Sequence, residues 1–430
     1  MKKTTIIITI LFLFFFSANA QQEIGIFGSS NWLNNWTEFN PNKKEYGEAN
    51  RILTGNISVN TRLEKRNIYL LKGSVYVTNN ATLIIDPGTV IICEADSNAS
   101  LIITKGATII ADGLETDPIV FTSNKAFKKA GDWGGIIVLG EAPINKFGGV
   151  SSVIHNLNPA LTTYGGTNPK SNSGILRFLR IEFAGSKFKG AENFNSLLLC
   201  GVGNKTIIEN IMVSYSAGDS FGIFGGEIKL DKMVSFKSSS SDYKFNYGTQ
   251  CTIDNSLAVR SSYFSSIYGS RCLDVSSYDT KQEVDFTKKQ TKVVATNLTL
   301  VNNSDSISID IESGLVKEAI FVRENASLEC RKTVVSGFNP AVILDGKILI
   351  NDQNLNKIKF EQMYFNFCKG NIFTEFVANN EDLENWYGNS AFSNVYSKSD
   401  NIATFINFKT SKKPDFRLRI GKIVVSKVDK

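Results

Sequence analysis

A thirteen-residue segment of this chain occurs twice in close succession. The stretch "NATLIIDPGTVII" begins at Asn80, and "NASLIITKGATII" begins eighteen residues later at Asn98. Asn, Ala, Leu, Gly and both isoleucine pairs stand at identical offsets in the two copies. Self-similarity at a fixed short offset is typical of repeat architectures, so the copies are predicted to share one structure.

Each copy is predicted to fold as strand, turn and strand. Ile, Val and Thr favour strands, and Pro87-Gly88 suits the central positions of a type II turn. Eighteen residues can then form one coil of a parallel solenoid, in which strands stack about 4.8 Å apart. On this interpretation Asn80 and Asn98 stack at a bend. Antiparallel strands in a sandwich are the alternative, which leaves the close copies unexplained.

A longer period continues the pattern. The segments "VSYS", "VSFK" and "LAVR" begin at Val213, Val234 and Leu257, spaced by twenty-one and twenty-three residues. Such spacing is expected of a coil that carries one larger loop. We therefore predict an all-β solenoid over residues 53–345.

The start of the chain has the features of a signal peptide. Lys2 and Lys3 precede an apolar run that ends at Phe16, and Ala18-Asn19-Ala20 follows. Residues 1–20 are therefore predicted to be removed, and the mature protein is expected in the periplasm or outside the cell. No later apolar stretch predicts a transmembrane segment.

The parts of the chain that do not show the repeat are predicted to lie outside the regular coils. Residues 21–52 are predicted to lead into a cap over the open end of the solenoid, where strand edges would otherwise be unpaired. An inserted loop is predicted at about 146–173, carrying the single histidine, His155, as a surface residue. Residues 346–430 are expected to form the last coils and a second cap.

The charge and the cysteine content of the chain exclude some classes of function. The formal charge of +6 falls to +4 without Lys2 and Lys3, which is too mild to indicate nucleic acid binding. The six cysteines have no metal-like spacing, and we expect no metal or cofactor. Cys251 and Cys272 lie about one longer repeat apart and are a candidate disulfide, with buried unpaired thiols as the alternative.

Several motifs resemble a known group of proteins. They include "GDWGGIIVLGEAPIN" from Gly131, "SGILRFLRIEFAG" from Ser173 and "VSYSAGDSFGIFGG" from Val213. Together with the segment from Leu53 they resemble the exported right-handed parallel β-helix proteins common in the Bacteroidota, over roughly residues 53–260. The resemblance implies a right-handed parallel β-helix but no biochemical activity. Where relatives carry several acids, this chain keeps Asp219, so if relatives bind a hard cation such as Ca²⁺ there, this chain is predicted to have lost that site.

Two acids suggest a possible chemistry. Asp219 and Asp242 follow equivalent strands of successive coils, so they are expected to project from one edge about 5 Å apart, a separation that suits a retaining glycosidase. The alternative is that each carboxylate bonds nearby backbone amides and shapes its turn.

Aromatic and charged residues in the same region suggest binding instead. Exposed tyrosines can stack on sugar rings or anchor a protein partner. The candidates are Tyr243, Tyr247, Tyr263, Tyr268, Arg271 and Asp274. The leading hypothesis is an exported, non-catalytic β-helix that binds a glycan or a cell-surface partner through the loop edge at 219–274. The alternative is a polysaccharide lyase or glycoside hydrolase that acts from the same edge.

The repeat also predicts a covered outer face. Strict alternation points Leu83, Ile85, Leu101 and Ile103 inward and leaves Ile84 and Ile102 outside. Two stacked isoleucines on a solvated face require a cover, and we expect the chain before Leu53 or the tail after Asp345 to supply it.

Overall fold

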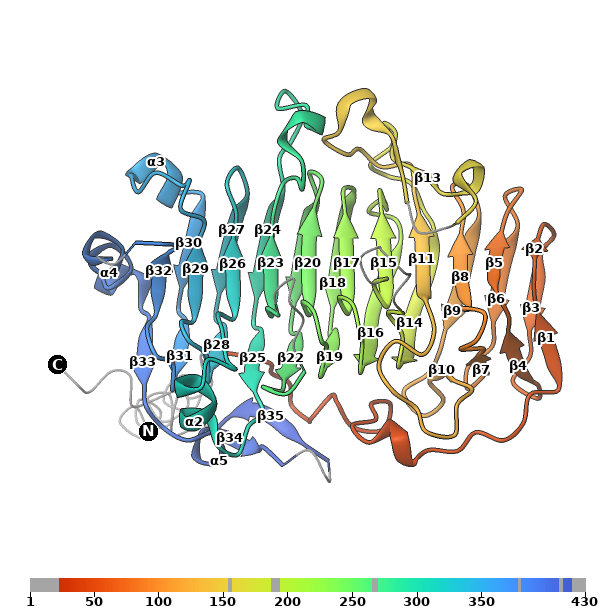
Figure 1. The fold of residues 1–430 in the computed structure, drawn as a ribbon, viewed down its shortest axis with the longest axis horizontal. Helices are drawn as coiled ribbons and strands as arrows, with labels where there is room; N and C mark the ends of the chain where they lie inside the picture. Colours follow the sequence, from red (N-terminus) through yellow and green to blue (C-terminus); the bar gives the residue numbers. More distant parts are fainter. Residues whose placement is uncertain are drawn as a thin grey trace, which may run out of the picture.

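The computed structural model describes residues 23–153, 157–186, 194–264, 270–377, 380–409 and 413–419. The predicted signal peptide, His155 and Tyr268 lie outside these residues. The described chain is an all-β parallel β-helix, as predicted, in which each coil contributes strands to three stacked ladders (Figure 1).

The first ladder contains one strand from each coil. Its strands are β2 (Asn56–Ile57), β5 (Ser74–Val77), β8 (Ser100–Ile103), β11 (Gly135–Leu139), β15 (Leu197–Cys200), β17 (Phe221–Phe224), β20 (Tyr243–Asn246), β23 (Leu273–Val275), β26 (Ile320–Val322), β29 (Val342–Leu344) and β32 (Ile372–Thr374).

The second and third ladders share two long strands, β14 (Gly174–Glu182) and β16 (Ile207–Ser214), which bend from one ladder into the other. The second ladder also holds β3 (Thr61–Leu63), β6 (Thr82–Ile85), β9 (Thr108–Asp112), β18 (Glu227–Asp231), β21 (Gln250–Asp254), β24 (Lys292–Thr296), β27 (Ser327–Arg331) and β30 (Ile358–Glu361). The third also holds β1 (Arg51–Leu53), β4 (Ile68–Leu71), β7 (Val90–Cys93), β10 (Ile119–Ser123), β19 (Val234–Phe236), β22 (Leu257–Arg260), β25 (Thr299–Asn302), β28 (Val334–Ser336), β31 (Tyr364–Asn366) and β33 (Val395–Ser397).

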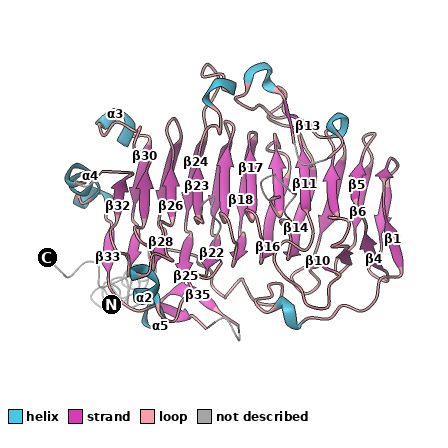
Figure 2. Ribbon diagram, in the orientation of Figure 1, coloured by secondary structure: helices cyan, strands magenta, loops and turns pink. Residues whose placement is uncertain are grey.

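Helices and antiparallel strands of the described chain occur outside the ladders, in the segment before β1, in the connections and in the tail (Figure 2). The α-helices are α2 (Ile307–Glu312), α3 (Asp352–Leu355), α4 (Glu381–Tyr387) and α5 (Asn401–Thr404), and the antiparallel pairs are β12 (Ser151–Ser152) with β13 (Thr163–Tyr164) and β34 (Phe405–Asn407) with β35 (Asp415–Leu418). No described helix is long and apolar enough to span a membrane.

The two sequence copies do not stack on each other, so the prediction of one coil per copy is wrong. The first copy forms β6 and β7, and the second forms β8 and β9. Ser74 pairs with Ser100 and Thr82 with Thr108, so one coil here spans 26 residues and three strands. Asn80 therefore stacks against Gly106 instead of Asn98, and a Cβ at Gly106 would come within 2.4 Å of Oδ1 of Asn80. Strands of similar aliphatic composition can occupy any of the three ladders. The copy that is nearest in the sequence is therefore not the segment that stacks on the first copy.

The prediction of which side chains of the copied strands point inward is confirmed. The segment that covers the outer face is not the expected one. Leu83, Ile85, Leu101 and Ile103 lie in the main core. Ile102 is fully buried on the outer face of the first ladder. The side chains that cover this face come partly from the inserted loop and include Val153, Leu157 and Tyr164. The cover is therefore the insert, neither the N-terminal segment nor the tail.

Ile84 lies on a different face and is only half-buried. It belongs to the second ladder, where Ile84 pairs with Ile110, Ile110 with Ile175 and Ile175 with Ile207. Ion pairs lie beside this row of isoleucines. One of them joins Nε of Arg177 to Oδ1 of Asp112 at 2.6 Å.

The segment before β1 does not cap the end of the solenoid, in contrast to the prediction. Residues 23–50, here called the N-terminal strap, run lengthwise along the outer face of the third ladder (Figure 1, red to orange). The backbone amide of Ile26 donates to Oγ1 of Thr299 at 3.0 Å, and the amide of Phe27 donates to Oδ1 of Asn255 at 2.9 Å. Trp36 is fully buried there, and the tail strands β34 and β35 pack beside the strap.

Candidate functional site

The predicted loop edge lies at the corner where the third ladder turns into the first. Asp219 stands in such a turn and is 7 % exposed. Its Oδ1 accepts hydrogen bonds from the Ser240 hydroxyl at 2.7 Å and from the Ser241 amide at 2.9 Å. This carboxylate therefore fixes the turn of the next coil, as the simpler interpretation predicted.

Asp242 is enclosed inside the solenoid. Its side chain has no exposed surface, and its Oδ2 accepts a hydrogen bond from Nη1 of Arg260 at 3.0 Å. Burial raises the pKa of Asp242, and the Arg260 guanidinium opposes that shift. A polysaccharide cannot reach this carboxylate, so the proposal of an open glycosidase pair is wrong. The serine residues around Asp242 instead form hydrogen bonds with buried polar groups.

The three predicted tyrosines that the structure describes do not form one surface. Tyr243 is fully buried and stacks on Phe221 with ring centroids 5.2 Å apart, because it points into the core from β20. Tyr247 lies beyond the end of β20, at the corner between the first and second ladders, where its hydroxyl bonds to Asp279. Tyr263 is 78 % exposed in a turn between the third and first ladders. Tyr243 is thereby excluded as a surface contact.

Arg271 and Asp274 are brought together, as their proximity in sequence suggested. Asp274 lies on the outer face of the first ladder, 3.5 Å from Nη1 of Arg271 and 3.1 Å from Nε of Arg323. Both guanidinium groups also lie over the ring of Phe321, at 4.4 and 4.6 Å. Burial acts to raise the pKa of Asp274, but the two guanidinium groups outweigh it and hold that pKa below its ordinary value. The group is an internally satisfied ion cluster.

The predicted disulfide is not formed. Cys251 and Cys272 are both buried and free. Cys251 belongs to β21 in the second ladder, whereas Cys272 precedes β23 in the first, so their side chains start from different corners. The spacing of twenty-one residues is shorter than the local coil, in which Tyr243 pairs with Leu273.

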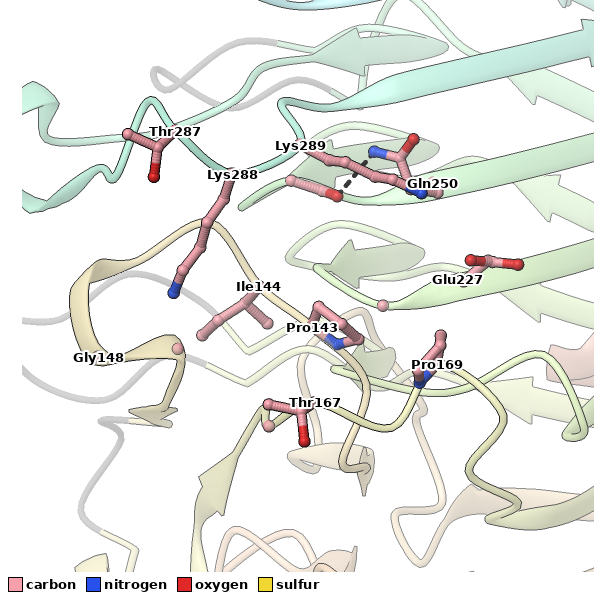
Figure 3. A pocket seen from close by; sticks show the side chains of 14 residues that line it. Pro143, Ile144, Gly148, Thr167, Pro169, Glu227, Gln250, Thr287, Lys288 and Lys289 are labelled. Atoms are coloured by element: carbon pink, nitrogen blue, oxygen red, sulfur yellow. Dashed lines mark hydrogen bonds between the residues drawn. The ribbon is translucent and has the colours of Figure 1, made fainter.

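Two large hollows lie along a different corner, where the first ladder turns into the second. One, hollow 1, has a volume of about 530 Å³, and the next, hollow 2, about 600 Å³. Gln250 and Lys289 line both, so the two hollows are neighbours along this corner, and together they are here called the groove. Hollow 1 is lined by Pro143, Ile144, Gly148, Gly149, Gly166, Thr167, Pro169, Gly226, Glu227, Gly248, Gln250, Thr287, Lys288 and Lys289 (Figure 3). Hollow 2 is lined by Gln250, Lys289, Gln290, Lys292, Glu324, Asn325, Ala326, Ser327, Lys347, Ile348, Leu349, Asn354, Lys357 and Ile358.

Every wall of the groove comes from the same kind of connection. The insert joins β11 to β14, residues 276–291 join β23 to β24, and residues 345–357 join β29 to β30, all from the first ladder to the second. Figure 1 shows these three connections rising from one edge of the solenoid. Stacking of coils therefore gathers segments that are far apart in the chain, such as those that hold Pro143 and Lys357.

The second ladder provides a row of polar side chains along the groove. Glu227 pairs with Gln250, Gln250 with Lys292, and Lys292 with Ser327, each in register on neighbouring strands. Successive members are therefore about 4.8 Å apart, the spacing of stacked strands.

Lysine dominates the charge of the groove. Lys288 lies 4.0 Å from Asp285, and Lys292 lies 3.1 Å from Glu329. The other three, Lys289, Lys347 and Lys357, are exposed and form no ion pair with any carboxylate in the described ranges. Glu227 and Glu324 are the acids of the lining, and Glu324 already pairs with Lys281 at 3.3 Å. The groove thus carries a surplus of positive charge.

The insert is fastened to the 276–291 connection. The amide nitrogen of the Asn145 side chain donates to the carbonyl of Ser277 at 2.9 Å, and Nζ of Lys288 donates to the carbonyl of Lys146 at 2.8 Å. Figure 3 shows Lys288 reaching toward Ile144 and Gly148, while Lys289 runs beside Gln250. These contacts hold two walls of hollow 1 at a fixed distance.

Sequence analysis missed this groove. The only local signal was the lysine-rich run at 288–292, and nothing in the sequence placed it beside residues 143–169 or 345–357. Among the described residues, no group of three or more His, Cys, Asp or Glu side chains is arranged to hold a metal ion.

Comparison with known proteins agrees with this architecture. The model of the pectate-lyase-like β-helix domain matches residues 55–407. The chain belongs to this family. Among solved structures, the crystal structure of pectate lyase Pel9A is similar to this pectate-lyase-like β-helix protein, with 11% sequence identity and a TM-score of 0.33, covering 86% of this chain and 90% of that one. No curated protein matches the chain significantly.

Proposed function

We propose that this β-helix protein is exported and binds an anionic glycan along the groove, without cleaving it. The observation that carries the proposal is the set of exposed lysines Lys289, Lys347 and Lys357, whose ammonium groups form no ion pair with a carboxylate of the described chain. Ammonium groups that form no ion pair within the protein and border one groove are suited to carboxylate or sulfate groups of a ligand.

The direction of the groove favours a linear polymer. It crosses the coils, so a bound chain would lie along the solenoid axis and meet one member of the Glu227, Gln250, Lys292 and Ser327 row per coil. The strand spacing of about 4.8 Å is close to the length of one pyranose unit in an extended chain. Because the spacing of the strands matches the length of a sugar unit, each sugar can meet an equivalent part of the backbone. The description of the family also supports a carbohydrate ligand.

A charge-removal experiment tests the proposal. The triple variant Lys289→Ala, Lys347→Ala, Lys357→Ala is compared with the wild type for binding to polyuronate and sulfated oligosaccharides by isothermal titration calorimetry. Each exposed charge contributes on the order of 0.2 to 1 kcal/mol, so we expect the triple variant to bind more weakly by a factor of about 3 to 150. The affinity of the wild type should also fall as salt is added, because exposed charges are screened.

The matched control removes three other exposed lysines outside the groove, Lys43, Lys105 and Lys369. This variant should keep wild-type affinity. Equal loss in both triple variants would show that only the overall charge matters and would overturn the assignment of the groove. The polymer length should stay constant during the experiment, and release of unsaturated or reducing ends would contradict the non-catalytic part of the proposal.

The proposed export has its own test. Cell fractionation with an antibody to the folded domain should find the protein in the periplasm or outside the cell, with residues 1–20 missing by mass spectrometry. Recovery of the full-length chain in the cytoplasm would refute export and leave the binding proposal to the calorimetric experiment.

A further inference from the structure

A separate pocket lies on the outer face of the third ladder, where the N-terminal strap meets the tail. It has a volume of about 430 Å³, within the range of small-molecule sites, and is here called the strap pocket. Its walls come from residues 33–44 of the strap and from Lys413 and Pro414 of the tail, and Arg180 of β14 lines it from the sheet. The side-chain amide of Asn31 donates to the carbonyl of Pro414 at 2.7 Å, which fixes the two walls relative to each other.

Arg180 is a buried cation whose hydrogen-bonding capacity is only partly used. It is 9% exposed, and its Nη2 donates to the Tyr46 hydroxyl at 2.8 Å. Its Nε lies 3.5 Å from Oε1 of Glu182 and forms no hydrogen bond, and Nη1 has no hydrogen-bond partner in the described part of the chain. A buried donor without a partner costs free energy, so this guanidinium is suited to an acceptor that enters the pocket.

The remaining lining offers more donors than acceptors. The ammonium group of Lys413 and the side-chain amides of Asn34 and Asn40 form no hydrogen bond or ion pair with other described residues. Glu38, the acid of the lining, is already engaged. Its Oε2 lies 3.3 Å from Nζ of Lys44, and its Oε1 accepts from the backbone amide of Asn40 at 2.8 Å.

The strap pocket also carries positive charge. Its lining holds three cations and one acid, namely Lys44, Arg180, Lys413 and Glu38. Glu182 does not line the pocket but pairs with Arg180, so three cations stand against two carboxylates. Lys128 and Glu115, which bond to lining residues from outside, add one charge of each sign. Unused donors together with a surplus of positive charge suit a ligand that has several anionic oxygens.

We propose that the strap pocket binds a tetrahedral oxyanion, phosphate or sulfate, either as the free ion or as the ester of a small sugar. Arg180 and Lys413 supply the charged donors, and the side-chain amides of Asn34 and Asn40 supply neutral ones. Because these donors belong to the strap, the sheet and the tail, a bound oxyanion ties the three segments together. The site is separate from the groove and does not depend on glycan binding there.

Isothermal titration calorimetry with inorganic phosphate and inorganic sulfate tests the site, with sodium chloride used to keep the ionic strength constant. One saturable site per chain is expected, and the melting temperature should rise with anion concentration because the folded state alone contains the pocket. Glucose 6-phosphate and glucose 6-sulfate distinguish the two sources. Tighter binding of an ester assigns the site to sugar esters, and equal or weaker binding assigns it to the free anion. Failure of all four probes to bind saturably would overturn the proposal.

Two variants locate the bound anion. Arg180→Lys keeps a positive charge beside Glu182 and removes the Nη1 donor, so phosphate affinity should fall at least about tenfold. Lys413→Met, at an exposed position of the tail, should lower phosphate affinity about two- to fivefold and leave the fold intact. If Arg180→Lys does not fold, Lys413→Met and its control decide the question alone.

The matched control is Lys43→Met, which removes an exposed lysine of the strap that does not line the pocket. It should keep wild-type phosphate affinity. Equal weakening in Lys43→Met and Lys413→Met would show general attraction to a basic surface and would overturn the site, as would wild-type affinity in Lys413→Met. The triple lysine variant of the groove should still bind phosphate, so this test succeeds or fails independently of the proposed function.

Discussion

The ammonium group of Lys146 lies 2.8 Å from the carboxylate of Glu283 and 4.4 Å from the ring centroid of Tyr247. These contacts join the insert to the 276–291 connection, and both segments line the groove. We expect Lys146→Met to weaken glycan binding severalfold because one of the contacts that hold the wall of hollow 1 is removed. The free energy of unfolding should change by less than about 1 kcal/mol, since the pair is partly exposed.

Calorimetric titration and urea unfolding of the same variant measure these two effects separately. Lys105→Met, at an exposed turn outside the groove, serves as the control and should leave both quantities unchanged. A Lys146→Met protein with wild-type affinity would show that this contact does not position the wall.

The buried pair of Arg260 and Asp242 predicts a large effect on stability. Arg260 is 3% exposed, and its guanidinium also donates to the carbonyl oxygens of Ser238 and Ser240. Arg260→Met leaves Asp242 without its cation inside the solenoid, a change that costs about 3 to 5 kcal/mol. Urea unfolding should show this loss, whereas Arg66→Met, in an exposed pair, should cost less than about 1 kcal/mol. Similar stability of the two variants would contradict a structural role for the buried pair.

Asp274 predicts a sensitivity to acid. Its pKa in the folded protein lies below the ordinary value of 3.8 because the Arg323 and Arg271 guanidinium groups overcome the effect of burial. The ionised form is therefore favoured by folding, and this contribution is fully present above the unfolded pKa and is lost as the pH falls through the lower folded pKa. Between about pH 5 and pH 2 the free energy of unfolding should fall less steeply in Asp274→Asn than in the wild type.

The matched control for that titration is Asp305→Asn, which removes an exposed carboxylate. Its slope of stability against pH should follow the wild type. If Asp274→Asn has the wild-type slope as well, the cluster around Phe321 does not favour the ionised carboxylate.

The free cysteines predict low thiol reactivity. Five of the six are buried, and burial raises the pKa of Cys368, the most accessible one, to about 11. A thiol of such high pKa reacts slowly near neutral pH, because the thiolate is the reactive form. Ellman's reagent should therefore label the native protein slowly and should titrate six thiols after denaturation. Fewer than six thiols in the denatured, non-reduced protein would indicate a disulfide.

The fold was predictable because one local feature, short aliphatic strands ended by turn residues, recurs along the chain. The inward positions of Leu83 and Leu101 followed from alternation alone. The stacking partners did not, because a coil of three similar strands offers three equivalent places for each aliphatic segment. The 18-residue offset between Asn80 and Asn98 separates segments that follow one another in the chain. Stacking depends instead on the 26-residue coil, which brings Gly106 next to Asn80.

The candidate site was not predictable, for a related reason. Asp219 and Asp242 were selected because they follow strands, but the structure directs Asp219 into hydrogen bonds that shape a turn and Asp242 into a buried ion pair with Arg260. The groove depends on connections of different lengths that meet only when the coils are stacked. Hollow 1 in particular depends on bare backbone at Gly226 and Gly248, which carries no chemical signal in the sequence.

The N-terminal strap changes how this solenoid should unfold. A stack of coils that contact only their neighbours can open from either end, one repeat at a time. Here Phe27 is bonded to Asn255, and Nη1 of Arg417 donates to the carbonyl of Gly28 at 2.8 Å, so residues hundreds of positions apart are tied together across the stack. Loss of a central coil would also release the strap from the coils on either side. The strap therefore couples distant repeats into a single cooperative unit, and denaturation is expected to be an all-or-none event instead of progressive fraying.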